Sequence, residues 1–187
     1  LAQKINSDGL ALYKDIPYIC GTAGTTPSAL KDLADVRRVL NANKAPVSPR
    51  YAVWDTAADA SLVTIPAIVN AEKSGSTQAL REGSLGRVMG LDNYMSQGIH
   101  QHTTGITSAS AVKVNGAVTK GATSLDIDGT ALVGKLVKGD VLTIDGKNYV
   151  VTEDSVAAAS NAITGVKVYP ALPDIKDNAD VTLDRKS

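Results

Sequence analysis

The sequence predicts an α+β fold class, with an α/β-like part at residues 1–108 followed by a small all-β barrel at residues 109–187. Helix-like and strand-like patterns alternate in the first part. After Gly105 helical periodicity ends, and short alternating runs separated by turn residues follow at roughly ten-residue spacing. The chain of 187 residues is long enough for two such domains.

The first part opens with a helical segment and a loop. Residues 1–16 are interpreted as the end of a preceding helix, because Leu1, Ile5 and Leu12 share one helical face. The Gly/Thr-rich segment Gly21–Pro27 predicts a loop.

A helix is expected directly after this loop. Thr26 supplies a hydroxyl cap, and Pro27 can occupy the first helical position. The helix then runs to about Asn41–Asn43, and Pro46 and Pro49 break the chain.

The remaining elements of the first part are short. Asp55 can cap a helix near Thr56–Leu62, which Pro66 limits. The other predicted elements are strands at Tyr51–Trp54, Leu85–Val88 and Leu91–Met95, a polar turn at Lys73–Thr77 and a helical turn at Leu80–Gly83.

The second part consists of short strands, and the domain boundary is placed at Thr107–Ala109. The dipeptide Asp145-Gly146 is the sharpest local signal, because it supplies the positive φ angles of a tight hairpin. The predicted strands are Ala111–Asn115, Thr123–Ile127, Val141–Ile144, Lys147–Thr152, Ile163–Tyr169 and Asp180–Leu183. Because this part has no Phe or Trp, we expect it to be marginal in stability and to melt first.

Charge and composition argue against several classes of function. Nineteen basic and 19 acidic residues balance, and neither part carries a clear excess, which argues against a dedicated nucleic-acid binder. No apolar run approaches the roughly 18–20 residues of a membrane span. Cys20 is the only cysteine, which excludes an internal disulfide and a thiolate metal cluster.

The motifs that could carry chemistry are each incomplete. His100 and His102 would share a face if they lay on a strand, but a metal site needs a third ligand, so a polar loop after the Leu91–Met95 strand is preferred. Asp126 and Asp128 before Gly129 resemble the opening of a calcium loop, yet no Glu closes it, so a surface turn is preferred.

The other candidates have plainer interpretations. Gly21–Gly24 lacks the Lys-Ser/Thr of a phosphate-binding loop, and Cys20 has no nearby His in the sequence to activate it, so a buried or inert thiol is expected. The basic spots Arg37-Arg38 and Lys135/Lys138 are interpreted as solvated faces. The sequence therefore predicts no catalytic, cofactor-binding or metal-binding residues and no enzymatic activity.

Residues around Tyr51–Ile99 carry a family resemblance. They contain PRYAVWDTAADASL and, after a turn, ALREGSLGRVMGLDNYMSQGI, with the pattern Gly86-Arg87 and Gly90-x-Asp92-x-Tyr94. This stretch resembles the major coat proteins of tailed bacteriophages, in particular the short-tailed-phage coat family whose subunit carries an inserted β domain. The preceding GTAGTTP and DLADVRRVLNANKAPV are similar to that family's lead-in, so the resemblance covers most of residues 10–105. In the second part, LVKGDVLTIDGKNYVVTED resembles the β-rich segment found at this place in the family.

The resemblance implies a structural subunit of a phage or prophage icosahedral capsid. Residues 1–108 would correspond to the capsid A domain and residues 109–187 to the insertion domain, as a central fragment of the major-capsid fold. The implied partners are copies of the same protein in pentamers and hexamers, a scaffolding protein, and packaged DNA contacted non-specifically, with no cofactor and no membrane. The implied location is the virion, and the host bacterial cytoplasm during assembly. Gly86, Gly90, Gly98 and Gly105 would permit tight turns at loop tips that meet neighbours, and plain hairpin geometry is an equally good interpretation of each of them.

Two other classes of function stay open. One is a surface-binding or carbohydrate-binding β module on a small α/β scaffold. Sugar-binding faces usually present exposed aromatic rings, and residues 109–187 offer only Tyr149 and Tyr169. The other class is an enzyme, which is the weakest because no acid, base, nucleophile or metal constellation is found.

Overall fold

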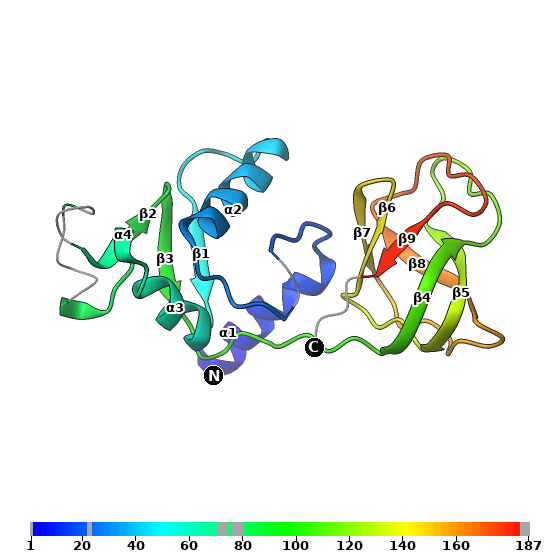
Figure 1. Cartoon of the computed structure of the whole chain (residues 1–187), viewed down its shortest axis with the longest axis horizontal. Helices are drawn as coiled ribbons and strands as arrows, with labels where there is room; N and C mark the ends of the chain where they lie inside the picture. Colours follow the sequence, from blue (N-terminus) through cyan, green and yellow to red (C-terminus); the bar gives the residue numbers. More distant parts are fainter. Residues whose placement is uncertain (1, 22–23, 71–74, 76–80, 184–187) are drawn as a thin grey trace. The chain divides into compact units, whose positions relative to one another are not determined.

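The computed structural model describes residues 2–21, 24–70, 75 and 81–183, and the backbone alone at residues 2 and 3. Its contacts divide the chain into two compact units (Figure 1). We call Leu1–Ser7 with Cys20–His100 the α/β unit, and Asp8–Ile19 with Gln101–Ser187 the β unit. Few helices, a small sheet and a nearly closed barrel-like sheet confirm the predicted α+β class in its coarse form.

The α/β unit is built on a three-stranded sheet with helices packed on one face. The strand order is β1-β3-β2, with β1 parallel and β2 antiparallel to β3. The core joins the helices to inward-facing strand residues such as Leu91 and, partly buried, Trp54. The elements of this unit are β1 (Tyr51–Trp54), β2 (Arg87–Val88), β3 (Leu91–Met95), α2 (Leu30–Ala42), α3 (Thr56–Val63), α4 (Pro66–Val69) and the start of α1 (Ala2–Leu10).

Helix α2 begins at Leu30, so the predicted start at Thr26-Pro27 is wrong. The residue at the N-cap is Ala29, which has no side-chain acceptor. Asp32 in the first turn reaches back instead, and its Oδ2 accepts the backbone N–H groups of Ser28 at 2.8 Å and Ala29 at 3.0 Å. A carboxylate at this position satisfies donors that the helix leaves free, and it also favours the positive end of the helix dipole.

Helix α3 follows the prediction closely. Asp55 Oδ1 accepts the Ala58 N–H at 2.9 Å, which confirms the predicted cap. Pro66 ends this run and occupies the first turn of α4, where its missing N–H costs nothing. The predicted turn Lys73–Thr77, apart from Gly75, and Leu80 at the start of the predicted helical turn lie outside the described residues.

The β unit is a six-stranded antiparallel sheet in the order β4-β5-β8-β7-β6-β9. The isolated bridge Lys113↔Asp180 joins β4 to the residue directly before β9, so the sheet closes nearly into a barrel. Its core contains 18 buried side chains, among which Tyr149 is the one aromatic ring. The elements are a short 3-10 helix η1 (Ala11–Asp15) and strands β4 (Ile106–Val114), β5 (Ser124–Gly134), β6 (Val141–Ile144), β7 (Lys147–Val151), β8 (Ala162–Tyr169) and β9 (Val181–Leu183).

Strands β4 and β5 are longer than predicted because bulges interrupt their alternation. In β4 the buried residues are spaced unevenly, the pairing with β5 shifts register, and Ala111 has a φ of +46°. In β5, Asp126 to Gly129 lies within the strand, so the predicted surface turn is wrong. Gly129 permits a close approach, since a Cβ there would lie 3.0 Å from the Ser110 carbonyl oxygen.

The predicted hairpin at Asp145-Gly146 is confirmed. These two residues, with φ of +49° and +72°, connect β6 to β7, which pair from Ile144↔Lys147 onward. Such angles at both central positions are those of a type I′ turn. Among the described residues, no helix has the length and apolar character needed to cross a membrane.

Candidate functional site

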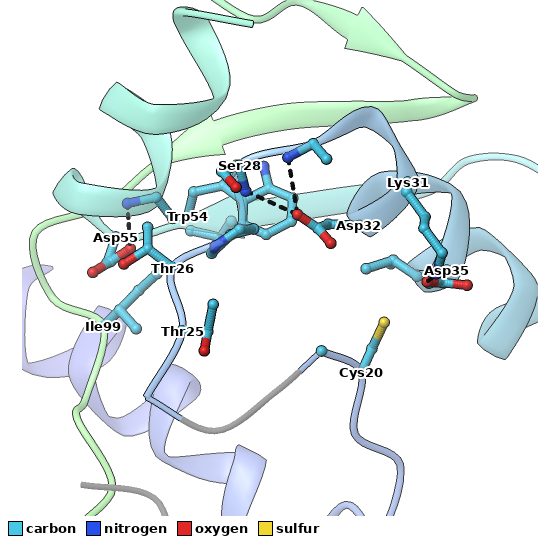
Figure 2. Close-up of a pocket in the computed structure, with 16 residues that line it drawn as sticks. Cys20, Thr25, Thr26, Ser28, Lys31, Asp32, Asp35, Trp54, Asp55 and Ile99 are labelled. Atoms are coloured by element: carbon cyan, nitrogen blue, oxygen red, sulfur yellow. Dashed lines mark hydrogen bonds and ion pairs between the residues drawn. The ribbon is translucent and has the colours of Figure 1, made fainter.

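A hollow of about 630 Å³ lies in the α/β unit where the loop before α2 meets the end of β1 (Figure 2). Its lining includes Cys20, Thr25, Ser28, Asp32 and Trp54. Carboxylates, hydroxyls and a thiol thus gather in one place, which makes this hollow the first place to look for chemistry.

The carboxylates of the hollow already have structural partners. Asp32 and Asp55 accept backbone N–H groups at the starts of α2 and α3, as the dashed lines of Figure 2 show. Asp35 is paired with Lys31 and Arg38, and these bonds, the Lys31 bond first, lower the pKa of its carboxyl. A general base must be free to take a proton, whereas these groups serve as helix caps and surface ion pairs.

The thiol of Cys20 is exposed rather than buried, but its surroundings make it a poor nucleophile. Partial desolvation raises its pKa first, and the nearby Asp35 carboxylate raises it further. Because the thiolate is the reactive form, a raised pKa lowers reactivity at neutral pH. Cys20 therefore does not supply an activated nucleophile to the hollow.

The face of the three-stranded sheet that the helices do not cover carries exposed apolar side chains, of which Val53 also lines the hollow. Tyr51 is 63% exposed, Val53 43% and Tyr94 57%. Strand alternation places these side chains on the face away from the core, with Val53 and Tyr94 paired in register across β1 and β3. The rings of Tyr51 and Tyr94 lie 6.2 Å apart between centroids. We call Tyr51, Val53, Arg87, Asp92 and Tyr94 the outer sheet face.

The outer sheet face contains the motif that carried the family resemblance. Arg87 and Asp92 pair in register across β2 and β3, with 3.7 Å between Nε and Oδ1. Met89 and Gly90 connect the two strands with φ of +53° and +80°, so the motif forms a tight hairpin. The face therefore combines two tyrosine rings with one cation and one anion.

Asn93 holds this hairpin on the neighbouring strand, and the sequence analysis did not single it out. Its Oδ1 accepts the Trp54 indole N–H at 2.9 Å. Its Nδ2 donates to the carbonyls of Gly86 and Leu91, both at 2.9 Å. The position of Asn93 inside the motif GLDNYM was the available signal, but its partner Trp54 lies 39 residues away in sequence.

The two histidines lie outside any strand, which confirms the preferred interpretation of a polar loop after β3. In the α/β unit, His100 Nε2 lies 3.0 Å from Ser7 Oγ. In the β unit, His102 lies between Tyr13 and Asp140, neither of which the sequence analysis had singled out. Among the described residues, no group of three or more His, Cys, Asp and Glu side chains could hold a metal ion.

The remaining sequence candidates have structural roles. Asp126 Oδ1 accepts the Gly165 N–H at 2.7 Å, which ties β5 to β8. Lys135 pairs with Asp154, and Lys138 pairs with Asp15, each at 2.7 Å.

The expected loop-tip glycines divide into two kinds. Gly86, directly before β2, and Gly90 have positive φ, and Gly90 and Gly98 lie in turns before and after β3. Gly105 differs, because a Cβ there would lie 2.5 Å from the carbonyl oxygen of Lys135. It therefore permits a close packing of two backbones rather than a loop tip.

The comparisons with known proteins add no relative. No protein-family model matches the chain, and no curated protein matches it. The functional argument therefore depends on the residues themselves and on the resemblance that they carry.

Proposed function

We propose that this chain is part of a structural subunit of a phage or prophage icosahedral capsid, which self-associates into capsomers that enclose DNA. The resemblance of Gly86-Arg87 and Gly90-x-Asp92-x-Tyr94 to coat proteins motivates the proposal. The single observation that supports it best is the outer sheet face, where two tyrosines and a valine are exposed on a sheet whose other face is covered by helices.

This surface suits contact with another copy of the same chain. Tyrosine rings supply apolar contact area, and Arg87 beside Asp92 presents both signs of charge, so the patch can pair with an identical one. Three strands of about four residues give a face on the order of 200 Å². Stable interfaces bury about 800 Å² per partner, so one such contact would be weak and a shell would need several different contacts per subunit.

The alternative of a sugar-binding β module has lost part of its support. Tyr149 is buried in the barrel core, so it cannot form a stacking platform. Tyr169 is then the one exposed ring that residues 109–187 offer.

The capsid proposal also includes pentamers and hexamers, a scaffolding partner, non-specific contact with DNA and a location in the virion.

Electron microscopy tests the proposal directly. The product of the complete reading frame that encodes this chain would be expressed with its upstream neighbour gene, in case assembly needs a scaffolding partner. Closed shells of uniform size are the expected result. A monodisperse small species in every preparation would overturn the proposal.

Substitutions test the role of the outer sheet face in the same preparations. The double variant Tyr51→Lys/Tyr94→Lys should reduce shell yield strongly, because it places two charges in the proposed contact. Tyr169→Lys is the matched control, since this tyrosine is equally exposed on a strand of the β unit. Equal yields from both variants would show that the outer sheet face is not a subunit contact.

A further inference from the structure

Residues 8–19 belong to the β unit although the barrel begins much later in the sequence. We call Asp8–Ile19 the strap. Its central residue is Tyr13 in η1, whose hydroxyl lies 2.9 Å from Nδ1 of His102. The two rings also meet edge to face, with centroids 5.6 Å apart. The His102 imidazole thus contacts the strap through both a hydrogen bond and a ring contact.

His102 is in turn held by a buried carboxylate. Its Nε2 lies 2.7 Å from Oδ1 of Asp140, whose side chain is 1% exposed. The other oxygen of Asp140 accepts the Val137 N–H at 2.8 Å. Carboxylate oxygens accept, so Nε2 of His102 donates in its bond to Asp140, and in that tautomer of the imidazole Nδ1 is the nitrogen left to accept from the Tyr13 hydroxyl. Burial and the charge of Asp140 raise the Tyr13 pKa, which keeps this donor protonated.

The strap also fits closely on the loop before β6. Gly139 has a φ of +100°, and a Cβ there would lie 3.0 Å from Lys14 Cγ and 3.2 Å from His102 Cε1. Next to it, Lys138 Nζ pairs with Asp15 Oδ1 at 2.7 Å. The contact is therefore built from matched polar groups and a glycine that leaves room for the strap.

Apolar burial contributes little to holding the strap. Leu12, Ile16 and Tyr18 are exposed, Leu10 and Ile19 are half-buried, and none of these side chains belongs to the core cluster of the barrel. Pro17 is buried, but its ring is small. Polar contacts are then important for holding the strap, and those through His102 are made by buried groups, whereas the Lys138–Asp15 pair is exposed to solvent.

We propose that Tyr13, His102 and Asp140 form a latch that holds the strap on the barrel and lets it open locally while the barrel stays folded. The chain passes between the two units at residues 7–8, 19–20 and 100–101. With the latch open, residues 100–101 are the one chain connection that still ties the barrel to the rest of the described chain. The latch is thus a conformational device, and it does not depend on the proposed capsid function.

Limited trypsin digestion of the full chain tests the latch. Cleavage after Lys14 reports strap opening, and cleavage after Lys44, an exposed residue of the α/β unit, normalises the protease activity. When reclosing is fast, cleavage follows the population of the open form. Tyr13→Phe removes the hydroxyl and keeps the ring, so it should accelerate cleavage after Lys14 about five- to tenfold, the population change expected from one lost hydrogen bond.

Two further variants locate the effect. Tyr18→Phe is the matched control, because it removes the hydroxyl of an exposed ring in the same strap and should leave cleavage unchanged. His102→Gln can still donate to Asp140 but cannot reach Tyr13, so it should match Tyr13→Phe. The double variant should cleave no faster than either single variant, since both remove the same bond.

Hydrogen exchange in the same variants separates strap opening from loosening of the barrel. Exchange at Val150 and Val151, which are fully buried in β7, should stay at the wild-type rate in Tyr13→Phe. Unchanged cleavage after Lys14 in Tyr13→Phe would overturn the latch. Faster cleavage that appears only together with faster exchange in β7 would show that the strap does not open on its own, and would overturn the proposal as well.

Discussion

Both units form a hydrophobic core without phenylalanine, but they cover this core in different ways. Among the described residues, the barrel buries 18 side chains in one cluster, whereas the α/β unit buries six and packs eight partly buried ones against them. A sheet that closes on itself covers its own inner face with opposite strands. A three-stranded sheet needs helices to cover one face and leaves the other exposed. We therefore expect the β unit to be the more stable of the two. The α/β unit is the one whose sheet leaves apolar side chains exposed to solvent.

The largest expected effect concerns the order of unfolding. Composition alone led us to expect the β unit to melt first, because it has no Phe or Trp. The distribution of buried side chains favours the opposite order, with the α/β unit unfolding at lower urea. Leu62→Ala and Ile127→Ala remove fully buried side chains from the two cores, and each should cost about 2–5 kcal/mol of unfolding free energy. In the smaller core this loss should be enough to unfold the unit.

Two probes separate the units in this experiment. Trp54 is the only tryptophan and packs against the α/β core, so its fluorescence reports that unit. Pulse-labelled hydrogen exchange of β6 and β7 reports the barrel. Leu62→Ala should move the fluorescence transition and leave exchange in the barrel unchanged, and Ile127→Ala should do the reverse. Loss of barrel protection before the Trp54 transition in the unsubstituted chain would restore the order expected from composition.

A smaller effect on stability is expected from substitutions in the β2–β3 turn of the α/β unit and the corresponding β6–β7 turn of the β unit. Gly90 and Gly146 both have positive φ and open space around a built Cβ, so alanine would meet no clash and its cost comes from the backbone alone. Each Gly→Ala substitution should cost about 1–2 kcal/mol. The preceding residue differs, since Met89 occupies the position that Asp145 occupies in the barrel. Met89→Asp should therefore stabilise the α/β unit, by up to about 1 kcal/mol, because Asp adopts positive φ more readily.

The urea midpoint of Trp54 fluorescence measures the effects in the α/β unit, and exchange in β6 and β7 measures the effect of Gly146→Ala. Gly9→Ala is the control, because Gly9 lies in helix α1 without a positive φ and also has open space around it. It should be neutral or slightly stabilising. Gly9 and Gly146 both belong to the β unit, so equal responses of Gly9→Ala and Gly146→Ala would contradict the turn argument.

Sequence reasoning succeeded where local signals and tertiary packing agree. Strands β3 and β6 have the predicted bounds, since both strands are next to turn residues, Gly90 before β3 and Asp145-Gly146 after β6. Helix α2 was misplaced because its cap comes from Asp32 reaching back to Ala29 rather than from a hydroxyl before the helix. The extra length of β4 was missed because bulges break the two-residue alternation.

The hydrogen-bonded groups around His102 and Asn93 could not be predicted from local sequence patterns, for a different reason. Tyr13 and His102 are 89 residues apart, and His102 and Asp140 are 38 apart, so no spacing rule connects them. Asn93 is similar, because its role depends on Trp54 in a strand that pairs with its own only after folding. Each of these residues looks ordinary in sequence and acquires its role from a distant partner.

The smallest expected effect is on the pKa of two surface carboxyl groups, one in each unit. Asp35 is bonded to Lys31 and Arg38 in the α/β unit, and Asp154 is bonded to Lys135 and to the backbone N–H of Lys138 in the β unit. The bond to the lysine side chain is the largest cause that lowers the pKa of each carboxyl below its ordinary value of 3.8. A folded-state pKa that is depressed stabilises the folded state above the unfolded pKa, and this stabilisation is lost as the pH falls through the folded pKa. Both pairs are at the surface, so added salt should weaken them.

Carbon-detected NMR titration of the two carboxyl groups tests this comparison. Lys31→Met should raise the pKa of Asp35 toward 3.8 and leave that of Asp154 unchanged, whereas Lys135→Met should do the reverse, so each variant is the control for the other. Each shift should be incomplete, because Arg38 still faces Asp35 and the Lys138 N–H still donates to Asp154. A backbone donor is fixed by the loop, whereas the Arg38 side chain is exposed and must be ordered to bind. The pKa of Asp154 should therefore stay lower than that of Asp35 after the lysines are removed, and equal values in the two variants would contradict this difference between the units.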